Sequence, residues 1–274
     1  MISTILPPLS FIKIFLLYFL CPIVLLSCGY DRYAMYFENT EAFELAKAVS
    51  DEDLDRIQEL VQKQPNLLEY SEPQFGVNVL IQSILSEKYK SFTKLLELGA
   101  NPNYISPITK ETPLITSTFL STFNGEPDLR FMRALLQHGA DPNYTIEEDF
   151  TDVNGNYHFA TTAFESSIDN LEKVKLLVQY GADPSKLIRG CHCTAFGSAV
   201  MRQQFDVINY FIDTLKVNVH QPMYVRENDT IYIQDLVKRY MSYKPNTSAY
   251  MEAQKLREKL QRMGIDFENH NYKL

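Results

Sequence analysis

The stretch LLQHGADPNY at residues 135–144 decides the fold, because the chain repeats it with few changes. Residues 95–104 read LLELGANPNY, and residues 177–185 read LVQYGADPS. In each copy a glycine supplies the left-handed backbone conformation that ends a helix without steric cost. The proline then pushes the residue before it out of helical geometry. Each copy therefore predicts the end of a helix followed by a turn.

The residues before each glycine predict the helix itself. Seven, four and three positions upstream of Gly99, Gly139 and Gly181, every residue is apolar, a spacing typical of one buried helix face. These residues are Phe92, Leu95 and Leu96, then Met132, Leu135 and Leu136, then Val174, Leu177 and Val178. We therefore expect three amphipathic helices with their apolar faces in equivalent places.

A second pattern lies upstream of these helices. Residues 112–117 read TPLITS, which places a hydroxyl suited to a helix N-cap before a proline at the first helical position. Residues 78–83, 162–167 and 194–199 follow the same plan. The sixth position is always small, as Ser or Ala, and this allows paired helices to approach closely.

Together the two patterns resemble the ankyrin repeat, with its T-P-L-H-x-A opening and L-L-x-x-G-A-D-x-N close. The resemblance implies an all-α repeat solenoid, an ankyrin-like stack of helix-turn-helix units with β-hairpin-type loops that project as fingers. It predicts a repeat domain at 40–274 with about six units, which start near residues 40, 77, 111, 161, 193 and 229. The last unit is expected to be a cap with an insertion. The histidine of the opening is absent, and Ile81, Ile115, Glu165 and Gly197 stand in its place.

Two insertions interrupt the regular spacing. Leu80 and Gly99 are 19 residues apart, whereas Leu114 and Gly139 are 25 apart, with the extra residues around STFNGEPDL. The larger insertion, at 144–159, stands where a finger belongs, and its Asn-Gly pair predicts a tight turn at the tip. Such insertions are either functional or tolerated slack.

The predicted fingers are rich in aromatic residues, which are good interface anchors when they are exposed on a rigid scaffold. The alternative is that the tyrosines pack one finger against the next. The candidate partner-binding residues are Tyr104, Tyr144, Asn154, Tyr157, His158 and Phe159.

The first thirty residues are different in kind. Residues 14–26 read IFLLYFLCPIVLL, which is shorter than the roughly 20 apolar residues of a membrane-spanning helix and fits the hydrophobic region of a signal peptide. Residues 25–29, LLSCG, resemble the bacterial lipobox, in which the cysteine, here Cys28, is lipidated. This predicts a signal peptide at 1–27 and a short tether at 28–39. The alternative is an uncleaved N-terminal anchor.

Composition and motifs argue against several functional classes. The chain has 26 basic and 34 acidic residues, a net charge of -8 and no basic block, which disfavours a nucleic-acid binder. There is no GxSxG, P-loop, HExxH or glycine-rich dinucleotide loop. We therefore expect no catalytic residues, no cofactor and no small-molecule substrate, and we predict that the protein is not an enzyme.

One short cluster has metal-ligand chemistry. Cys191, His192 and Cys193 are weak candidates for a zinc site, but tetrahedral structural zinc needs four ligands. A fourth ligand would have to come from elsewhere in the chain, and His220 and His158 are the candidates. A local disulfide or free thiols at a finger tip are the alternatives, and no metal is predicted.

The two resemblances together imply a function. We expect a lipid-anchored protein of the bacterial cell envelope that binds another protein through its finger tips and the concave face of its first helices. Gly29, where inner-membrane retention in enteric bacteria uses aspartate, favours the outer membrane, facing the periplasm or the outside. The alternative is an immunity-type inhibitor that binds one toxin or enzyme and fills the active site of that target with the 144–159 finger.

Overall fold

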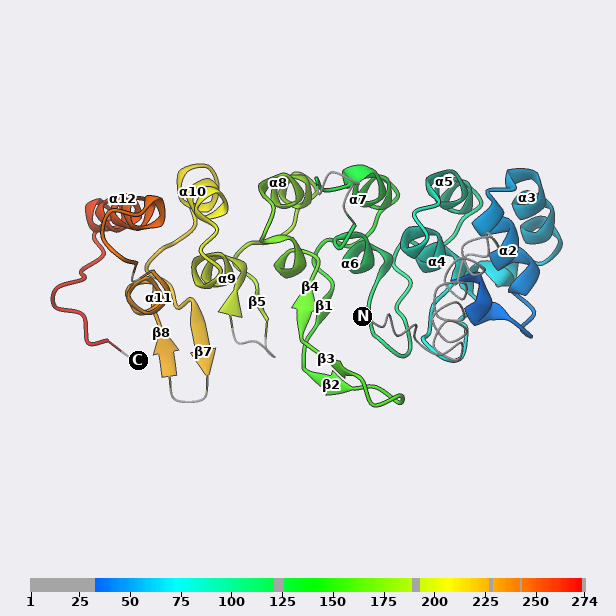
Figure 1. Cartoon of the computed structure of the whole chain (residues 1–274), viewed down its shortest axis with the longest axis horizontal. Helices are drawn as coiled ribbons and strands as arrows, with labels where there is room; N and C mark the ends of the chain where they lie inside the picture. The colour runs from blue at the N-terminus through cyan, green and yellow to red at the C-terminus, as the bar shows by residue number, and fades with distance from the viewer. Residues whose placement is uncertain (1–32, 121–125, 189–192, 227–228, 242, 273–274) are drawn as a thin grey trace, which may run out of the picture.

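The computed structural model describes residues 33–120, 126–188, 193–226, 229–241 and 243–272. Within them, helices follow one another in antiparallel pairs along an elongated row (Figure 1). The pairs are α2 (Phe43–Asp51) with α3 (Leu54–Lys63), α4 (Val79–Leu85) with α5 (Tyr89–Glu97), α6 (Pro113–Ser117) with α7 (Leu129–Gln137), η3 (Glu165–Ser167) with α8 (Leu171–Gln179), α9 (Ala195–Met201) with α10 (Phe205–Asp213), and α11 (Ile233–Tyr240) with α12 (Ser248–Arg262). Two further short helices, η1 (Ala34–Phe37) and η2 (Pro65–Glu69), flank the first pair.

From α4 onward the first helices of the pairs form one row and the second helices form another (Figure 1). This arrangement is the linear stack that the repeated sequence predicts, and it is consistent with an ankyrin-like helical repeat fold. Among the described residues, no helix is both long and apolar enough to cross a membrane.

The openings cap their helices as the sequence predicts. The Asn78 side chain accepts a hydrogen bond from the Ile81 N–H at 2.9 Å, and the Thr194 hydroxyl accepts one from the Gly197 N–H at 3.1 Å. Thr112 caps α6 in the same way, with its hydroxyl 3.3 Å from the Ile115 nitrogen. A cap of this kind stabilises a helix by about 1 kcal/mol.

The fourth pair departs from the prediction of two α-helices. Thr162 caps the Glu165 N–H at 3.0 Å, but the segment that follows forms only the 3-10 turn η3. Serine is a weak helix former, and the Ser167 hydroxyl donates back to the Ala163 oxygen at 2.7 Å. Asn170 then starts α8 almost at once. The prediction of a full first helix is therefore wrong here.

The helix ends are alike in the three pairs with the GA(D/N)P motif. Gly99, Gly139 and Gly181 have φ of 95°, 85° and 87°. A Cβ added to any of them would meet nothing within 4 Å, so the backbone conformation, and not a lack of space, favours glycine. The N–H of each following alanine donates to the oxygen five residues earlier at 3.0 Å, the bond of a Schellman cap.

The core is one continuous apolar cluster along the row. Leu95, Leu135 and Leu177, which each lie four residues before the glycine of their repeat, are all fully buried, at 0% exposure. The small residues at the sixth position of each opening are also fully buried. These residues are Ser83, Ser117, Ser167 and Ala199. Equivalent burial at equivalent positions supports the repeat interpretation.

The loops between pairs carry the β structure. In the long finger (residues 144–162), β1 (Thr145–Ile146) pairs with β4 (Thr161–Thr162), and farther out β2 (Phe150–Thr151) pairs with β3 (Tyr157–His158). Near the C-terminus two neighbouring fingers merge, because Cys193 pairs with Tyr224. The result is a four-stranded antiparallel sheet with the order β5 (Leu187–Ile188), β6 (Cys193–Thr194), β7 (Tyr224–Arg226), β8 (Asp229–Ile231).

Candidate protein-binding face

Asparagine side chains tie the finger bases together. The Asn103 amide donates to the Gly139 oxygen at 2.9 Å, and its oxygen accepts from the Asp141 N–H at 2.7 Å. Asn143 makes the same two contacts one unit later, to Gly181 and Asp183, each at 2.9 Å. These bonds align successive loops into one continuous surface. The signal for them is the asparagine of the repeated motif, which sequence reasoning used only as part of a turn.

The tip of the long finger is organised by Asp152, whose side chain is 2% exposed. Its carboxylate accepts hydrogen bonds from the His158 Nε2 at 2.9 Å, the Asn154 N–H at 2.8 Å and the Asn156 N–H at 2.9 Å. The bond from His158, together with those from Asn156 and Asn154, holds the pKa of Asp152 well below its ordinary value. Gly155, with φ of 84°, closes the turn as the Asn-Gly pair predicts.

The long finger leans along the array toward the N-terminal pairs (Figure 1). The Asn154 amide donates to the main-chain oxygen of Gln74 at 2.6 Å, which joins the tip to the loop before α4. Nearer its base, the Lys110 ammonium lies 4.0 Å from the centre of the Phe150 ring. Phe150 also stacks on His158, with ring centroids 4.9 Å apart. The insertion is therefore an ordered element.

Two of the six sequence-predicted partner-binding residues are used for packing. Tyr104 is 8% exposed, and its hydroxyl donates to the Gly76 oxygen at 2.9 Å, so the expectation of an exposed anchor is wrong for this residue. Tyr144 is half-buried, and its hydroxyl donates to the Lys110 oxygen at 3.0 Å. Burial raises the pKa of both phenols. For these two, the packing alternative describes the structure.

Tyr157 and Phe159 remain as exposed aromatics, at 57% and 71% exposure. Their rings meet edge to face with centroids 5.0 Å apart. The Tyr157 hydroxyl donates to Asp149 at 2.6 Å, and Asp149 also accepts from the Ala160 N–H at 2.7 Å. Both aromatic side chains therefore project from a segment that is hydrogen-bonded on its own finger.

The remaining two predicted residues support this pair. The His158 side chain is 20% exposed and is held between Phe150 and Asp152, so it offers little surface of its own. Asn154 is exposed at the tip, and its amide donates to the main-chain oxygen of Gln74.

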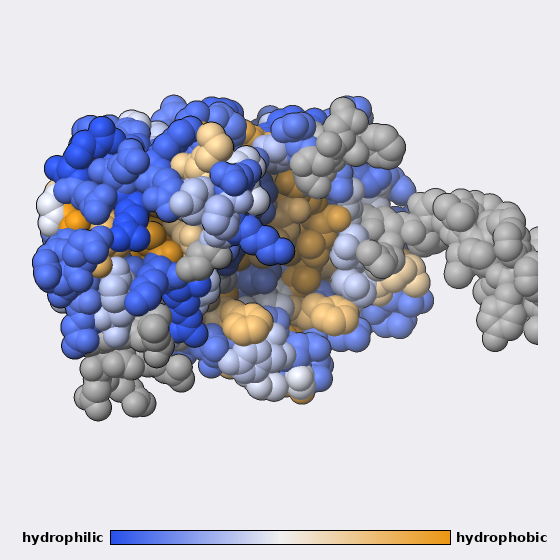
Figure 2. Space-filling view, turned by 60° about the vertical axis from the view of Figure 1, so that its left-hand side comes forward, coloured by the Kyte–Doolittle hydropathy of each residue, from blue (hydrophilic) through white to orange (hydrophobic). Residues whose placement is uncertain are grey.

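The surface of the array is not uniform. Figure 2 shows that the outer surface is mostly hydrophilic and that apolar side chains gather in a hollow.

The cysteine cluster is only partly visible. Cys191 and His192 lie outside the described residues, whereas Cys193 is buried in β6 and takes part in a disulfide bond. A sulfur held in a disulfide has no thiolate to give a metal. The guessed fourth ligands have partners elsewhere: His158 bonds Asp152, and the His220 Nε2 lies 3.1 Å from the Met263 oxygen. In the described part of the chain, no group of three or more potential ligands could hold a metal ion.

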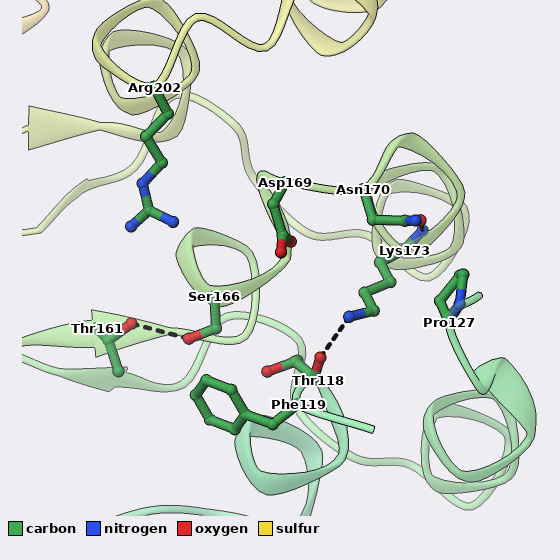
Figure 3. A pocket seen from close by; sticks show the side chains of 9 residues that line it. All are labelled: Thr118, Phe119, Pro127, Thr161, Ser166, Asp169, Asn170, Lys173 and Arg202. Carbon is green, nitrogen blue, oxygen red and sulfur yellow. Dashed lines mark hydrogen bonds between the residues drawn. The ribbon is translucent and has the colours of Figure 1, made fainter. Parts of the chain in front are cut away.

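A cavity of about 500 Å³ lies between the third, fourth and fifth helix pairs (Figure 3). Sequence reasoning missed it, because its residues come from segments far apart in the chain. Its lining residues are Thr118, Phe119, Pro127, Thr161, Ser166, Asp169, Asn170, Lys173 and Arg202. The local sequence signal for this site is Glu165, which stands in the place of the repeat histidine. Its Oε1 accepts a hydrogen bond from the Arg202 Nη2 at 2.8 Å. Burial raises the pKa of Glu165, although Arg202 opposes this.

The family model described as ankyrin repeats (many copies) matches residues 169–212, which contain α8, α9 and α10. This match supports the ankyrin-repeat family, whose repeats generally mediate protein–protein interaction and are generally not enzymatic. No curated protein matches the chain in sequence.

Proposed function

With ankyrin repeats as the premise, we propose that the whole array is one ankyrin stack of six units that binds another protein. The partner contacts the finger tips and the concave face formed by the first helices. Repeat arrays build extended concave surfaces of this kind because each unit contacts only its neighbours. The finger bases are aligned by Asn103 and Asn143, which supports a continuous binding surface.

The observation that carries this proposal is the exposed pair Tyr157 and Phe159 on the long finger. Aromatic side chains contribute most to an interface when they are already held in place, because little conformational entropy is then lost on binding. The finger supplies this support through Asp149 and Asp152, and through the contact of Asn154 with Gln74.

The test is a pull-down from envelope extracts with the native chain as bait, followed by quantitative mass spectrometry. We expect the double variant Tyr157→Ser, Phe159→Ser to lose the specific partner while keeping the native helical content and melting temperature. The matched control is Ile105→Ser, which removes an apolar side chain that is 48% exposed on another loop. Equal capture by all three proteins would refute the aromatic pair as the binding element.

The membrane attachment is a separate part of the proposal. Cys28 is lipidated after removal of residues 1–27, and residues 28–39 tether the repeats to the bacterial cell envelope through this lipid. Cys28 lies outside the described residues, so the support is the LLSCG motif alone. Metabolic labelling with an alkyne fatty acid tests it: the native chain incorporates label and Cys28→Ala does not. An unlabelled chain that keeps its first 27 residues, measured by intact mass, would instead indicate an uncleaved anchor.

The position in the outer membrane follows the same motif, through Gly29. Fractionation of inner and outer membranes checks it. The immunity-type inhibitor has no separate support, because the finger tip is bonded to Gln74, and insertion into an active site would require this contact to break.

A further inference from the structure

We infer that the cavity between the third, fourth and fifth helix pairs binds a carboxylate group attached to an apolar body. Its volume of about 500 Å³ lies in the range of cavities that hold small molecules or single side chains of a partner. The carboxylate belongs either to a free small molecule or to a partner protein, and only the second case rests on the proposed function.

The first support is Lys173, which is 7% exposed on α8. Its ammonium donates to the Thr118 oxygen at 2.6 Å, which uses one of its three N–H donors. Among the described residues, no carboxylate lies within ion-pair distance of this nitrogen. Lysine is seldom buried without a counter-charge, because desolvation of the ammonium is costly. An anion in the cavity would supply that charge.

The second support is Arg202, the residue after α9, whose guanidinium points toward the cavity (Figure 3). Glu165 holds one of its nitrogens at 2.8 Å, and the arginine side chain is 47% exposed. A guanidinium has five N–H donors in a fixed planar arrangement, so the rest of its edge is available to a carboxylate. Two parallel hydrogen bonds are the preferred geometry of such a pair.

The remaining walls select the shape of the ligand. The Thr161 and Ser166 hydroxyls, 3.1 Å apart, lie on the same side of the cavity as Arg202 and offer further polar contacts. Phe119, which is 65% exposed, supplies an apolar part of the lining. An aromatic or aliphatic body attached to the carboxylate would pack against this ring.

The charges favour a single negative group over phosphate. Lys173 and Arg202 are balanced in number by Glu165 and by Asp169, which lines the cavity. The Asp169 carboxylate repels a bound anion, and a doubly charged phosphate is repelled more strongly than a carboxylate. If the ligand is an anion, removal of the Asp169 charge should therefore strengthen its binding.

The experiment uses the full chain in detergent and benzoate as the probe, followed by saturation-transfer NMR. We expect benzoate to bind and inorganic phosphate to compete less well than acetate. Lys173→Met weakens binding about tenfold, the effect of losing one charge-assisted contact. The matched control is Lys175→Met on the exposed side of the same helix, where the lysine pairs with Glu172 at 2.7 Å. This control leaves the affinity unchanged.

Two further variants keep the test decisive if Lys173→Met fails to fold. Arg202→Lys keeps the charge beside Glu165 but loses the planar fork, and it weakens benzoate binding. Asp169→Asn removes the repulsion and strengthens binding. Absence of benzoate binding at millimolar concentration, stronger competition by phosphate, or weaker binding in Asp169→Asn would each overturn the inference.

The source of the carboxylate is decided with the partner from the pull-down. If benzoate displaces the captured partner and Lys173→Met reduces capture, the carboxylate belongs to that partner. If benzoate binds and capture is unchanged, the ligand is a free carboxylate. Failure of the proposed function is distinguishable, because it appears as equal capture by the Tyr157, Phe159 double variant while benzoate still binds.

Discussion

The side-chain amide of Asn154 and the main-chain oxygen of Gln74 are 2.6 Å apart, although 80 residues separate them in the chain. This hydrogen bond joins the tip of the long finger to the loop before α4. The long finger thereby contacts an earlier unit of the array as well as its own. We expect this contact to hold the side of the finger that carries Tyr157 and Phe159 in one orientation.

Asn154→Ala should release the tip without unfolding the array. One hydrogen bond contributes about 1 kcal/mol, and the core packing of the helix pairs is untouched. We expect faster amide hydrogen exchange at residues 147–159 and little change in melting temperature. The neighbouring Val153→Ala is the control, since this side chain is 85% exposed. Equal exchange in both variants would show that the contact with Gln74 does not hold the finger.

Gly139 and Gly197 should both resist replacement by alanine, but for different reasons. At Gly139 the obstacle is φ of 85°, and alanine there costs about 1–2 kcal/mol. At Gly197 the obstacle is space, because an added Cβ would lie 2.7 Å from the Met223 oxygen. Asparagine tolerates the left-handed region, so Gly139→Asn should recover part of the loss. Gly197→Asn should be worse than Gly197→Ala. Urea unfolding measures the loss in each variant. If asparagine were better tolerated than alanine at both sites, or worse tolerated at both, this account would be contradicted.

The features that the sequence predicts well are those decided by nearby residues. The caps at Asn78, Thr112 and Thr194 depend on a side chain and an N–H three residues later. The turn at Gly155 likewise needs only its neighbours. Such patterns depend only on nearby residues, so these helix starts and this turn could be predicted directly. The fourth pair is an exception, because the segment capped by Thr162 forms only η3.

What the sequence could not predict depends on contacts across units. Tyr104 is buried by the loop around Gly76, and nothing near Tyr104 in the chain indicates this. Lys173 is buried although lysine is usually solvated, and its ammonium donates to the main-chain oxygen of Thr118 in the preceding unit. The contact of Asn154 with Gln74 and the merging of β6 with β7 are also products of the stack.

The loop asparagines should couple neighbouring units. Asn143→Ala removes two hydrogen bonds to the next loop, and we expect a loss of about 1–3 kcal/mol in the free energy of unfolding. Asn218→Ala is the control, because the Asn218 side chain bonds only the His220 N–H within its own loop, among the contacts of the described residues. Its loss should be smaller. Equal losses in urea unfolding would mean that the bonds between loops add nothing beyond local turn stability.

Glu111 should make stability depend on pH. Burial raises the pKa of its carboxyl, although a hydrogen bond from Thr116 at 3.3 Å and the charge of His158 oppose this. The folded chain therefore binds this proton more tightly than the unfolded chain. The contribution of Glu111 to stability is lost as the pH rises above the ordinary pKa of a glutamate.

Glu111→Gln should accordingly raise the free energy of unfolding at pH 7, because the amide keeps an acceptor for Thr116 without a buried charge. At pH 4, where the native carboxyl is protonated in the folded chain, the two proteins should differ little. Glu147→Gln, at an exposed position of the long finger, is the control and should have no such pH dependence. Thermal melts of the three proteins between pH 4 and pH 7 measure this. A destabilising effect of Glu111→Gln at pH 7 would mean that the ionised carboxylate is held by a favourable contact and that its burial is not the dominant influence.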